Sequence, residues 1–236
     1  MTSIAQNLAP IRDQIASACR RAQRPESDVA LMAVSKMHPV EAILEAHAAG
    51  LRLFGENRVQ EFQQKHPTVS LLADASFHLI GPLQSNKSTR AVELFHSIDT
   101  VDSLKLAQRL NSAAQSLGKI VPILVEVKLS HEESKHGLAP EDLPALLNAL
   151  AELPHLLPQG LMTVPPWPDD PQDGGESARP YFQALRRLRD ENQLCHPSLT
   201  QLSMGMSNDF KVAIEEGSTC VRIGTALFGK RIYSEA

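Results

Sequence analysis

The stretch DVALMAVSKMHPVEAILEAHAAG, residues 28–50, predicts one strand followed at once by one helix. Residues 28–35 are mostly apolar and rich in strand-forming side chains. Residues 39–50 begin with Pro39, a residue common in the first turn of a helix, and end on Gly50, a residue common where a helix stops. Lys36 stands between the two, where an apolar strand has no ordinary use for an ammonium group. The stretch therefore predicts a β-α unit with a lysine at the carboxyl end of its strand.

The same β-α pattern repeats along the rest of the chain. Further strands are expected at residues 51–57, 77–81, 95–99, 120–129, 156–164, 199–206 and 218–224. The helices expected between them cover residues 58–65, 85–94, 102–118, 141–153, 178–192 and 208–217. Eight such units in a chain close to the roughly 250 residues typical of the class predict an α/β fold, a single (β/α)₈ TIM-type barrel. A doubly wound sheet is the competing prediction, but no block of residues is left over for a second domain.

Residues 1–27 precede the first strand and predict an extra helix. Ile4, Leu8, Ile11 and Ile15 recur at the period of an amphipathic helix, without the continuous apolar core of a secretory signal. We therefore expect one domain, residues 1–236, whose N-terminal helix packs on the barrel.

Composition and charge exclude several classes of function. The net charge of −4 gives no general attraction to nucleic acid or to an anionic membrane surface. The chain has three cysteines, Cys19, Cys195 and Cys220. Because their number is odd and they lack C-x-x-C spacing, neither a disulfide framework nor a zinc site is predicted. No apolar run approaches the length of a membrane span. These features indicate a protein of the reducing cytoplasm with no membrane or nucleic-acid partner.

Two loops offer donors for a phosphate group. In such barrels the active site lies at the carboxyl ends of the strands, and phosphate is often held after strands seven and eight. The seventh predicted strand ends in SMGMSND, with the hydroxyls of Ser203 and Ser207 on either side of Met206. The eighth ends in RIGT, where Gly224 lets backbone amides approach an anion beside the hydroxyl of Thr225. Each loop alone is equally well explained as a helix cap and a turn.

Lys36 would face the same cavity, because strand one neighbours strand eight when the barrel closes. A lysine amine beside a phosphate site indicates a phosphorylated aldehyde bound as a Schiff base. This bond needs the neutral amine, and lowering a lysine pKa from about 10.4 to about 7 takes roughly 4.6 kcal/mol, which desolvation in an apolar barrel mouth can provide. The alternative is a strand-end lysine whose ammonium group reaches water.

Arg222 bears on the chemistry that such a cofactor would have. If it meets the pyridine nitrogen of pyridoxal phosphate, its permanent charge keeps that nitrogen unprotonated and makes the ring a weaker electron sink. Such a site disfavours transamination. The alternative role of Arg222 is an ion pair with an acid at the barrel rim.

Other candidate residues carry weaker signals. Asn57 follows the second predicted strand and His78 lies on the third, and a hydrogen-bonded structural role explains each at least as well as a cofactor contact. The segment HEESKH, residues 131–136, lacks the H-E-x-x-H spacing of zinc sites, so no metal site is predicted. Lys135 in this segment is a candidate ligand contact.

Seven blocks of sequence, in order along the chain, resemble one known family. They are AVSK, FGENRVQE, FHLIGPLQSNK, ESKHGL, GLMTV, LSMGMSNDF and VRIGTALFG. From about residue 29 to residue 233 the chain is similar to the pyridoxal phosphate homeostasis proteins, a family allied to the N-terminal barrel of alanine racemase. Leu79 and the loop PPWPDDPQDGG, residues 165–175, depart from the family pattern.

The resemblance implies a cofactor, its contacts and a function. It implies pyridoxal phosphate carried on Lys36, with phosphate contacts from residues 203–207, Gly224 and Thr225 and with Arg222 facing the pyridine nitrogen. It also implies a binding protein of intracellular pyridoxal phosphate (vitamin B6) homeostasis that serves amino-acid metabolism indirectly. Its partners would be pyridoxal phosphate itself and the apoenzymes that receive it, and no residue would be catalytic.

Two other functions stay open on the sequence. A pyridoxal-phosphate-dependent amino-acid racemase needs a second proton carrier opposite the lysine. In the racemases a tyrosine from a second domain has that role. In this chain Tyr181 lies in a surface-helix pattern and Tyr233 lies at the C-terminal tail. A histidine such as His78 would therefore have to carry the proton instead. A sugar-phosphate enzyme would explain the phosphate loops but not the lysine. The missing parts favour a monomeric carrier with an exposed cofactor over an enzyme.

Overall fold

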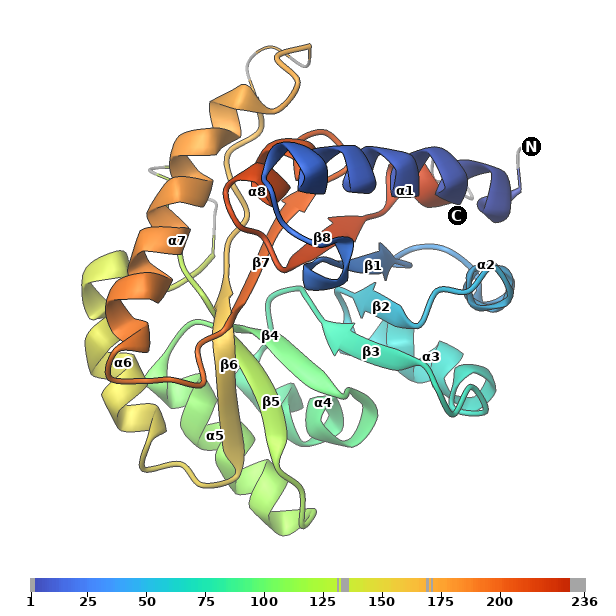
Figure 1. Cartoon of the computed structure of the whole chain (residues 1–236). Coiled ribbons are helices and arrows are strands. Elements are labelled where there is room, and N and C mark those ends of the chain that lie inside the picture. Colours follow the sequence, from blue (N-terminus) through green and yellow to red (C-terminus); the bar gives the residue numbers. More distant parts are fainter. Residues whose placement is uncertain (1–2, 131, 133–135, 169, 171, 230–236) are drawn as a thin grey trace.

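The computed structural model describes residues 3–130, 132, 136–168, 170 and 172–229. Over these residues the chain forms a closed barrel of eight parallel strands in the order β1 to β8, with helices packed around its outside (Figure 1). The predicted (β/α)₈ barrel is therefore confirmed. The strands are β1 Ala30–Val34, β2 Leu53–Glu56, β3 Ser76–Leu79, β4 Ser97–Val101, β5 Val121–Glu126, β6 Leu156–Met162, β7 Gln201–Met206 and β8 Cys220–Ile223. The α-helices are α1 Ile4–Arg21, α2 Val40–Ala48, α3 Val59–Val69, α4 Ser88–Leu94, α5 Leu104–Ser116, α6 Leu143–Leu150, α7 Arg179–Gln193, α8 Phe210–Glu215 and α9 Thr225–Phe228.

Pairing between the first and last strands decides against the doubly wound sheet. Strand β1 pairs with β8 in parallel, with Ala30 opposite Cys220 and Ala33 opposite Ile223. Strand β8 pairs on its other side with β7, where Ser203 lies opposite Cys220. Closure therefore brings the carboxyl ends of β7, β8 and β1 side by side.

Helix α1 is the extra N-terminal helix that the apolar period predicts. Ile4, Leu8, Ile11 and Ile15 are all buried, and α1 lies along α8 and α9 (Figure 1). The amide of Asn7 donates to the carbonyl oxygen of Leu227 at 2.8 Å. The helix therefore packs on the end of the chain that closes the barrel.

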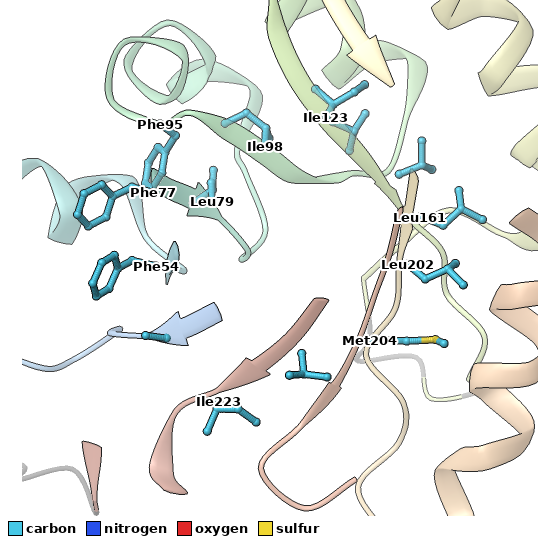
Figure 2. Packing of buried hydrophobic residues seen from close by; sticks show 14 of the residues in the cluster. Phe54, Phe77, Leu79, Phe95, Ile98, Ile123, Leu161, Leu202, Met204 and Ile223 are labelled. Atoms are coloured by element: carbon cyan, nitrogen blue, oxygen red, sulfur yellow. The ribbon is translucent and has the colours of Figure 1, made fainter. Parts of the chain in front are cut away.

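Aromatic side chains join one side of the barrel to its helices. Phe54 on β2 stacks on Phe77 on β3 with ring centroids 5.2 Å apart, and Phe62 of α3 meets Phe77 at 4.9 Å and Phe95 at 4.6 Å. Phe54, Phe77 and Phe95 lie together at this side in Figure 2. Aromatic pairs at such distances stabilise packing beyond the burial of their area.

Helix α3 extends four residues beyond its predicted end at Lys65. It runs to Val69 with Pro67 inside its last stretch. A proline ordinarily ends a helix near this point, but Val69 is buried against the core and holds the final turn in place. The extension leaves Lys65 inside the helix rather than at its end.

Candidate functional site

A cavity of about 440 Å³ opens at the carboxyl ends of β1, β6, β7 and β8. Its volume lies within the ~300–1,000 Å³ range typical of small-molecule sites. Six of the nine predicted site residues line it: Lys36, Met206, Ser207, Arg222, Gly224 and Thr225. Residues more than 180 positions apart in the sequence thus meet at one place, as expected from barrel closure.

Lys36 lies two residues after the end of β1, in a turn where the carbonyl oxygen of Ser35 accepts a hydrogen bond from the His38 amide at 3.1 Å. Val34, at the end of β1, and Lys36 both line the cavity. The intervening Ser35 is fully buried on the other side, and its hydroxyl donates to Glu56 at 2.8 Å. The lysine is therefore a cavity residue rather than a strand-end side chain directed into bulk water.

Arg222 on β8 is held at the cavity by hydrogen bonds to Ser203 on β7 and to Thr163, which directly follows β6. Its Nη1 donates to the carbonyl oxygen of Ser203 at 2.6 Å and to the Ser203 hydroxyl at 2.8 Å, and its Nη2 donates to the carbonyl oxygen of Thr163 at 2.8 Å. These partners are neutral oxygen atoms, and the side chain is 4% exposed. The bonds fix the plane of a buried guanidinium whose charge they do not neutralise.

Buried carboxylates surround this guanidinium at longer range. Burial lowers the pKa of Arg222, while Asp209, Glu126 and Asp99 act in the opposite direction. Burial raises the pKa of Glu126 to about 7, and the Arg222 charge only partly opposes this effect. The guanidinium of Arg222 thus lies in the field of several buried acids at this end of the barrel.

Replacing Glu126 with glutamine is expected to raise the free energy of unfolding at pH 8 by about 2–3 kcal/mol and to change it little at pH 5. The folded-state pKa of about 7 lies above the ordinary 4.5, so the stabilising effect of the protonated form is complete below pH 4.5 and is lost as the pH rises through 7. Glutamine stays neutral throughout. Urea unfolding at both pH values measures the difference, with exposed Glu141→Gln as control. Equal effects of Glu126→Gln at the two pH values would contradict the prediction.

Three predicted site residues lie outside the cavity lining. His78 Nδ1 lies 3.0 Å from Asp99 Oδ2, and Asp99 also accepts a hydrogen bond from the Ser97 hydroxyl. Ser203 reaches the site only through Arg222. The side-chain oxygen of Asn57 is buried and has no hydrogen-bond partner among the described residues. As cofactor contacts, these three residues stay predictions.

The β7 and β8 loops are tied to each other and to α8. The Ser207 hydroxyl accepts a hydrogen bond from the Ala226 amide at 3.4 Å. Asp209 precedes α8 and accepts a hydrogen bond from the Met206 amide at 2.5 Å. Burial raises the pKa of this carboxyl. The two predicted phosphate loops therefore form one connected surface.

Sequence reasoning missed the rim of the cavity. Residues 164–168, VPPWP, line one side, and Trp167 is 70% exposed. His38 lines another side and stacks on Phe228 with ring centroids 4.9 Å apart. The signal for the first was a lone tryptophan among prolines directly after a predicted strand.

Two residues named in the sequence analysis cannot be placed in the structure. Lys135 and Tyr233 lie outside the described residues. Among the residues that are described, histidines, cysteines and acids form no group of three that could hold a metal ion. Within the same part of the chain, every helix is too short or too polar to span a membrane.

The barrel and its site define a known class of protein. Residues 6–232 match the family model of the alanine racemase N-terminal domain. Alanine racemase of Clostridium difficile 630 is 15% identical with a TM-score of 0.66, over 95% of this chain and 57% of that chain, a likeness of fold alone. The chain is thus a barrel of the alanine racemase N-terminal class.

Proteins of higher sequence identity specify the family within that class. The pyridoxal phosphate homeostasis protein of Pseudomonas aeruginosa is 44% identical over 233 residues, 99% of this chain and 98% of that protein. The protein of the same name from Escherichia coli K12 is 42% identical over 237 residues, the whole of both chains. PipY of Synechococcus elongatus PCC7942, solved with PLP bound, is 43% identical with a TM-score of 0.81, over 93% of this chain and 100% of that chain. The chain belongs to the pyridoxal phosphate homeostasis protein family.

Proposed function

We propose that this protein binds pyridoxal phosphate as a Schiff base on Lys36 and acts in intracellular pyridoxal phosphate homeostasis, without robust catalysis of its own. The observation that carries the proposal is that Lys36, Arg222 and the β7 and β8 loops line one cavity. An aldehyde, a pyridine nitrogen and a phosphate group would each have a partner of suitable chemistry there. The PLP bound to PipY supports the choice of cofactor.

The residues present fit this cofactor. Ser207 and Thr225 bring hydroxyl donors for the phosphate, and Gly224, directly after β8, leaves the backbone accessible. Arg222 brings a guanidinium that its bonds to Ser203 hold in place. When bound, pyridoxal phosphate supplies an aldehyde carbon that reacts with amines, and this chain binds and orients it.

Carriage is favoured over amino-acid racemisation. A racemase needs a second proton carrier facing the lysine across the substrate. Tyr181 lies on α7 and is not among the described cavity residues, and His78 is held by Asp99 instead of lining the cavity. Relatives in the family carry the name homeostasis protein rather than the name of an enzyme. Formation of D-alanine from L-alanine by the purified protein, lost in Lys36→Ala, would establish the racemase instead.

The partners follow from the same proposal. A carrier in the cytoplasm would hand pyridoxal phosphate to apoenzymes that depend on it, and we expect it to act as a monomer. Mixing the loaded protein with such an apoenzyme tests transfer, with the gain of apoenzyme activity as the readout. Light scattering tests the monomer.

Lys36→Ala is expected to abolish covalent attachment of pyridoxal phosphate at this position. The wild-type protein should be yellow, and borohydride should fix the cofactor on the peptide that contains residue 36, because reduction makes the carbon–nitrogen bond permanent. Visible spectra and peptide mass mapping measure both effects. Lys105→Ala, which removes an exposed lysine of α5, is the matched control and should behave as wild type.

Two results would contradict this function. A wild-type protein that stays colourless with added pyridoxal phosphate would exclude both the carrier and the racemase. Attachment mapped to a different lysine in the wild-type protein would exclude Lys36 as the carrier residue.

A further inference from the structure

A buried charged cluster lies behind Lys36, between the β1–β2 side of the barrel and α3. At its centre the Lys65 ammonium donates to Glu56 Oε1 at 2.8 Å and to Glu61 Oε1 at 2.7 Å. Lys65 is 9% exposed and Glu56 is fully buried, while the Glu61 side chain is 21% exposed. The cluster is therefore shielded from water on the barrel side and partly open on the helix side.

The cluster holds the backbone on both sides of Lys36. On one side, Lys65 also donates to the carbonyl oxygen of Ser35 at 3.0 Å, and the Ser35 hydroxyl donates to Glu56 at 2.8 Å. On the other side, the backbone amide of Met37 donates to Glu61 Oε1 at 2.6 Å. The residues before and after the cavity lysine are thus both tied to α3.

The backbone directly after Lys36 has an unfavourable conformation. Met37 has a φ of +61°, in the left-handed region that side chains other than glycine rarely adopt. Such a conformation persists only where the surrounding contacts enforce it, and it is enriched at functional sites. The bond from the Met37 amide to Glu61 is a contact that enforces it.

A purely stabilising ion pair would not explain this arrangement. Burial raises the pKa of Glu56 and Lys65 opposes that shift, so the cluster carries a desolvation cost. The Oε2 atom of Glu56 has no hydrogen-bond partner among the described residues. Buried ion pairs are often no more stabilising than apolar replacements, and their best-attested use is to specify one geometry. Here the geometry specified is that of residues 35–37.

We propose that Glu61 and Lys65 are positioning residues, which fix the backbone around Lys36 so that its amine reaches the aldehyde carbon of bound pyridoxal phosphate. This inference rests on the proposed function. In the step concerned, the lone pair of the neutral amine forms a bond to the aldehyde carbon, and the aldehyde oxygen leaves as water with both protons of the nitrogen. A lysine side chain is long and flexible, so its amine samples many positions around the Cα atom. A fixed backbone keeps this sampled region close to the aldehyde carbon and so raises the frequency with which the two atoms meet.

The test separates formation of the covalent bond from binding of the ring and phosphate. Pyridoxine 5′-phosphate carries an alcohol in place of the aldehyde and cannot form the bond. The dissociation constants of pyridoxal phosphate and of pyridoxine 5′-phosphate are measured for each variant by the fluorescence of Trp167, the single tryptophan of the chain, which lines the cavity. Their ratio isolates the contribution of Lys36.

In Glu61→Ala and in Lys65→Met the ratio of the two dissociation constants is expected to move about tenfold against pyridoxal phosphate, while binding of pyridoxine 5′-phosphate changes less than about twofold. Glu61→Gln keeps an oxygen that accepts from the Met37 amide and should retain the wild-type ratio. Phe62→Leu is the matched control, because it loosens the packing of α3 without touching the cluster, and it should also keep the ratio.

A wild-type ratio in both Glu61→Ala and Lys65→Met would overturn the inference. So would an equal change in Phe62→Leu, because the ratio would then report general loosening of α3. Should Lys65→Met fail to fold, Glu61→Ala decides, since its side chain is partly exposed and its loss leaves the pair of Lys65 with Glu56 intact. Failure of the proposed function gives a different result. The wild-type protein itself would then bind pyridoxal phosphate and pyridoxine 5′-phosphate with equal dissociation constants.

Discussion

Replacing Arg222 with methionine should destabilise the barrel by roughly 3–5 kcal/mol at pH 8 and by clearly less at pH 5. Methionine fills a similar length without donors, so the carbonyl oxygens of Ser203 and Thr163 lose the bonds that Arg222 makes to them. The substitution also removes the cation that lies among Glu126 and Asp209. Both losses act on the carboxyl ends of the strands that form the cavity.

The pH dependence follows from the two acids. Burial raises the pKa of Glu126 and of Asp209, and in both cases the Arg222 charge opposes the shift. Without Arg222 both pKa values rise further above their unfolded values. Stability is then lost as the pH rises through the raised folded-state values. At pH 5 Glu126, whose pKa is about 7 in the wild-type protein, is largely protonated, so the loss of the Arg222 charge costs less stability there.

Urea unfolding of the ligand-free proteins at pH 5 and pH 8 checks this prediction. Arg186→Met, at an exposed position of α7, is the matched control and should stay within about 0.5 kcal/mol of wild type. Arg222→Lys restores the charge without the planar fork and should recover part of the loss at pH 8. An equal loss for Arg222→Met at the two pH values would contradict the role of the charge, and no loss at all would contradict the role of the bonds.

The barrel could be predicted because each strand and each helix has a recognisable local sequence pattern. Apolar runs of strand-forming residues alternate with helical periods, and this β-α pattern occurs eight times along the chain. The end of α3 could not be predicted in this way. Pro67 is a local signal to stop, whereas the burial of Val69 that keeps the last turn helical depends on the finished fold.

The site was predictable where position along a strand decides it. Lys36, Gly224 and Thr225 follow the carboxyl ends of β1 and β8, and barrel closure alone brings them together. His78 was ambiguous, because a side chain on a barrel strand can face a ligand or a neighbour such as Asp99. A lone tryptophan among prolines was a signal for the rim around Trp167, but this local pattern does not specify that residues 164–168 lie against the cavity.

The cluster behind Lys36 shows a further limit of local reasoning. Glu56 is a charged residue of a strand, whereas Glu61 and Lys65 lie four residues apart in a helix, a spacing typical of a solvated helix face. Their contact with the backbone of Ser35 and Met37 arises only when α3 packs on β2 and β1. Glu56 and Lys65, which the sequence would assign to the surface, are here buried, and Glu61 is only partly exposed.

Gly160→Ala is expected to have the largest effect on stability, about 4–5 kcal/mol or more. A Cβ atom at this position would overlap the carbonyl oxygen of Gln201 on β7 and lie 2.6 Å from its carbonyl carbon. Gly160 pairs with Gln201 and follows an irregularity in the β5–β6 register, so its missing side chain allows the close approach of β6 and β7. Alanine would push β6 and β7 apart at the amino end of β7, where the pairing of the two strands begins.

Gly118→Ala is the control that separates this overlap from the general cost of replacing a glycine. Gly118 has a φ of +62°, and a Cβ there would meet no heavy atom within 4 Å. Its replacement should cost only the roughly 1–2 kcal/mol of a left-handed backbone. Urea unfolding of both variants measures the difference, and the yield of folded Gly160→Ala is a second readout. A Gly160→Ala protein as stable as Gly118→Ala would mean that β6 and β7 can separate locally, and the close strand approach at Gly160 would then not be needed for closure of the barrel.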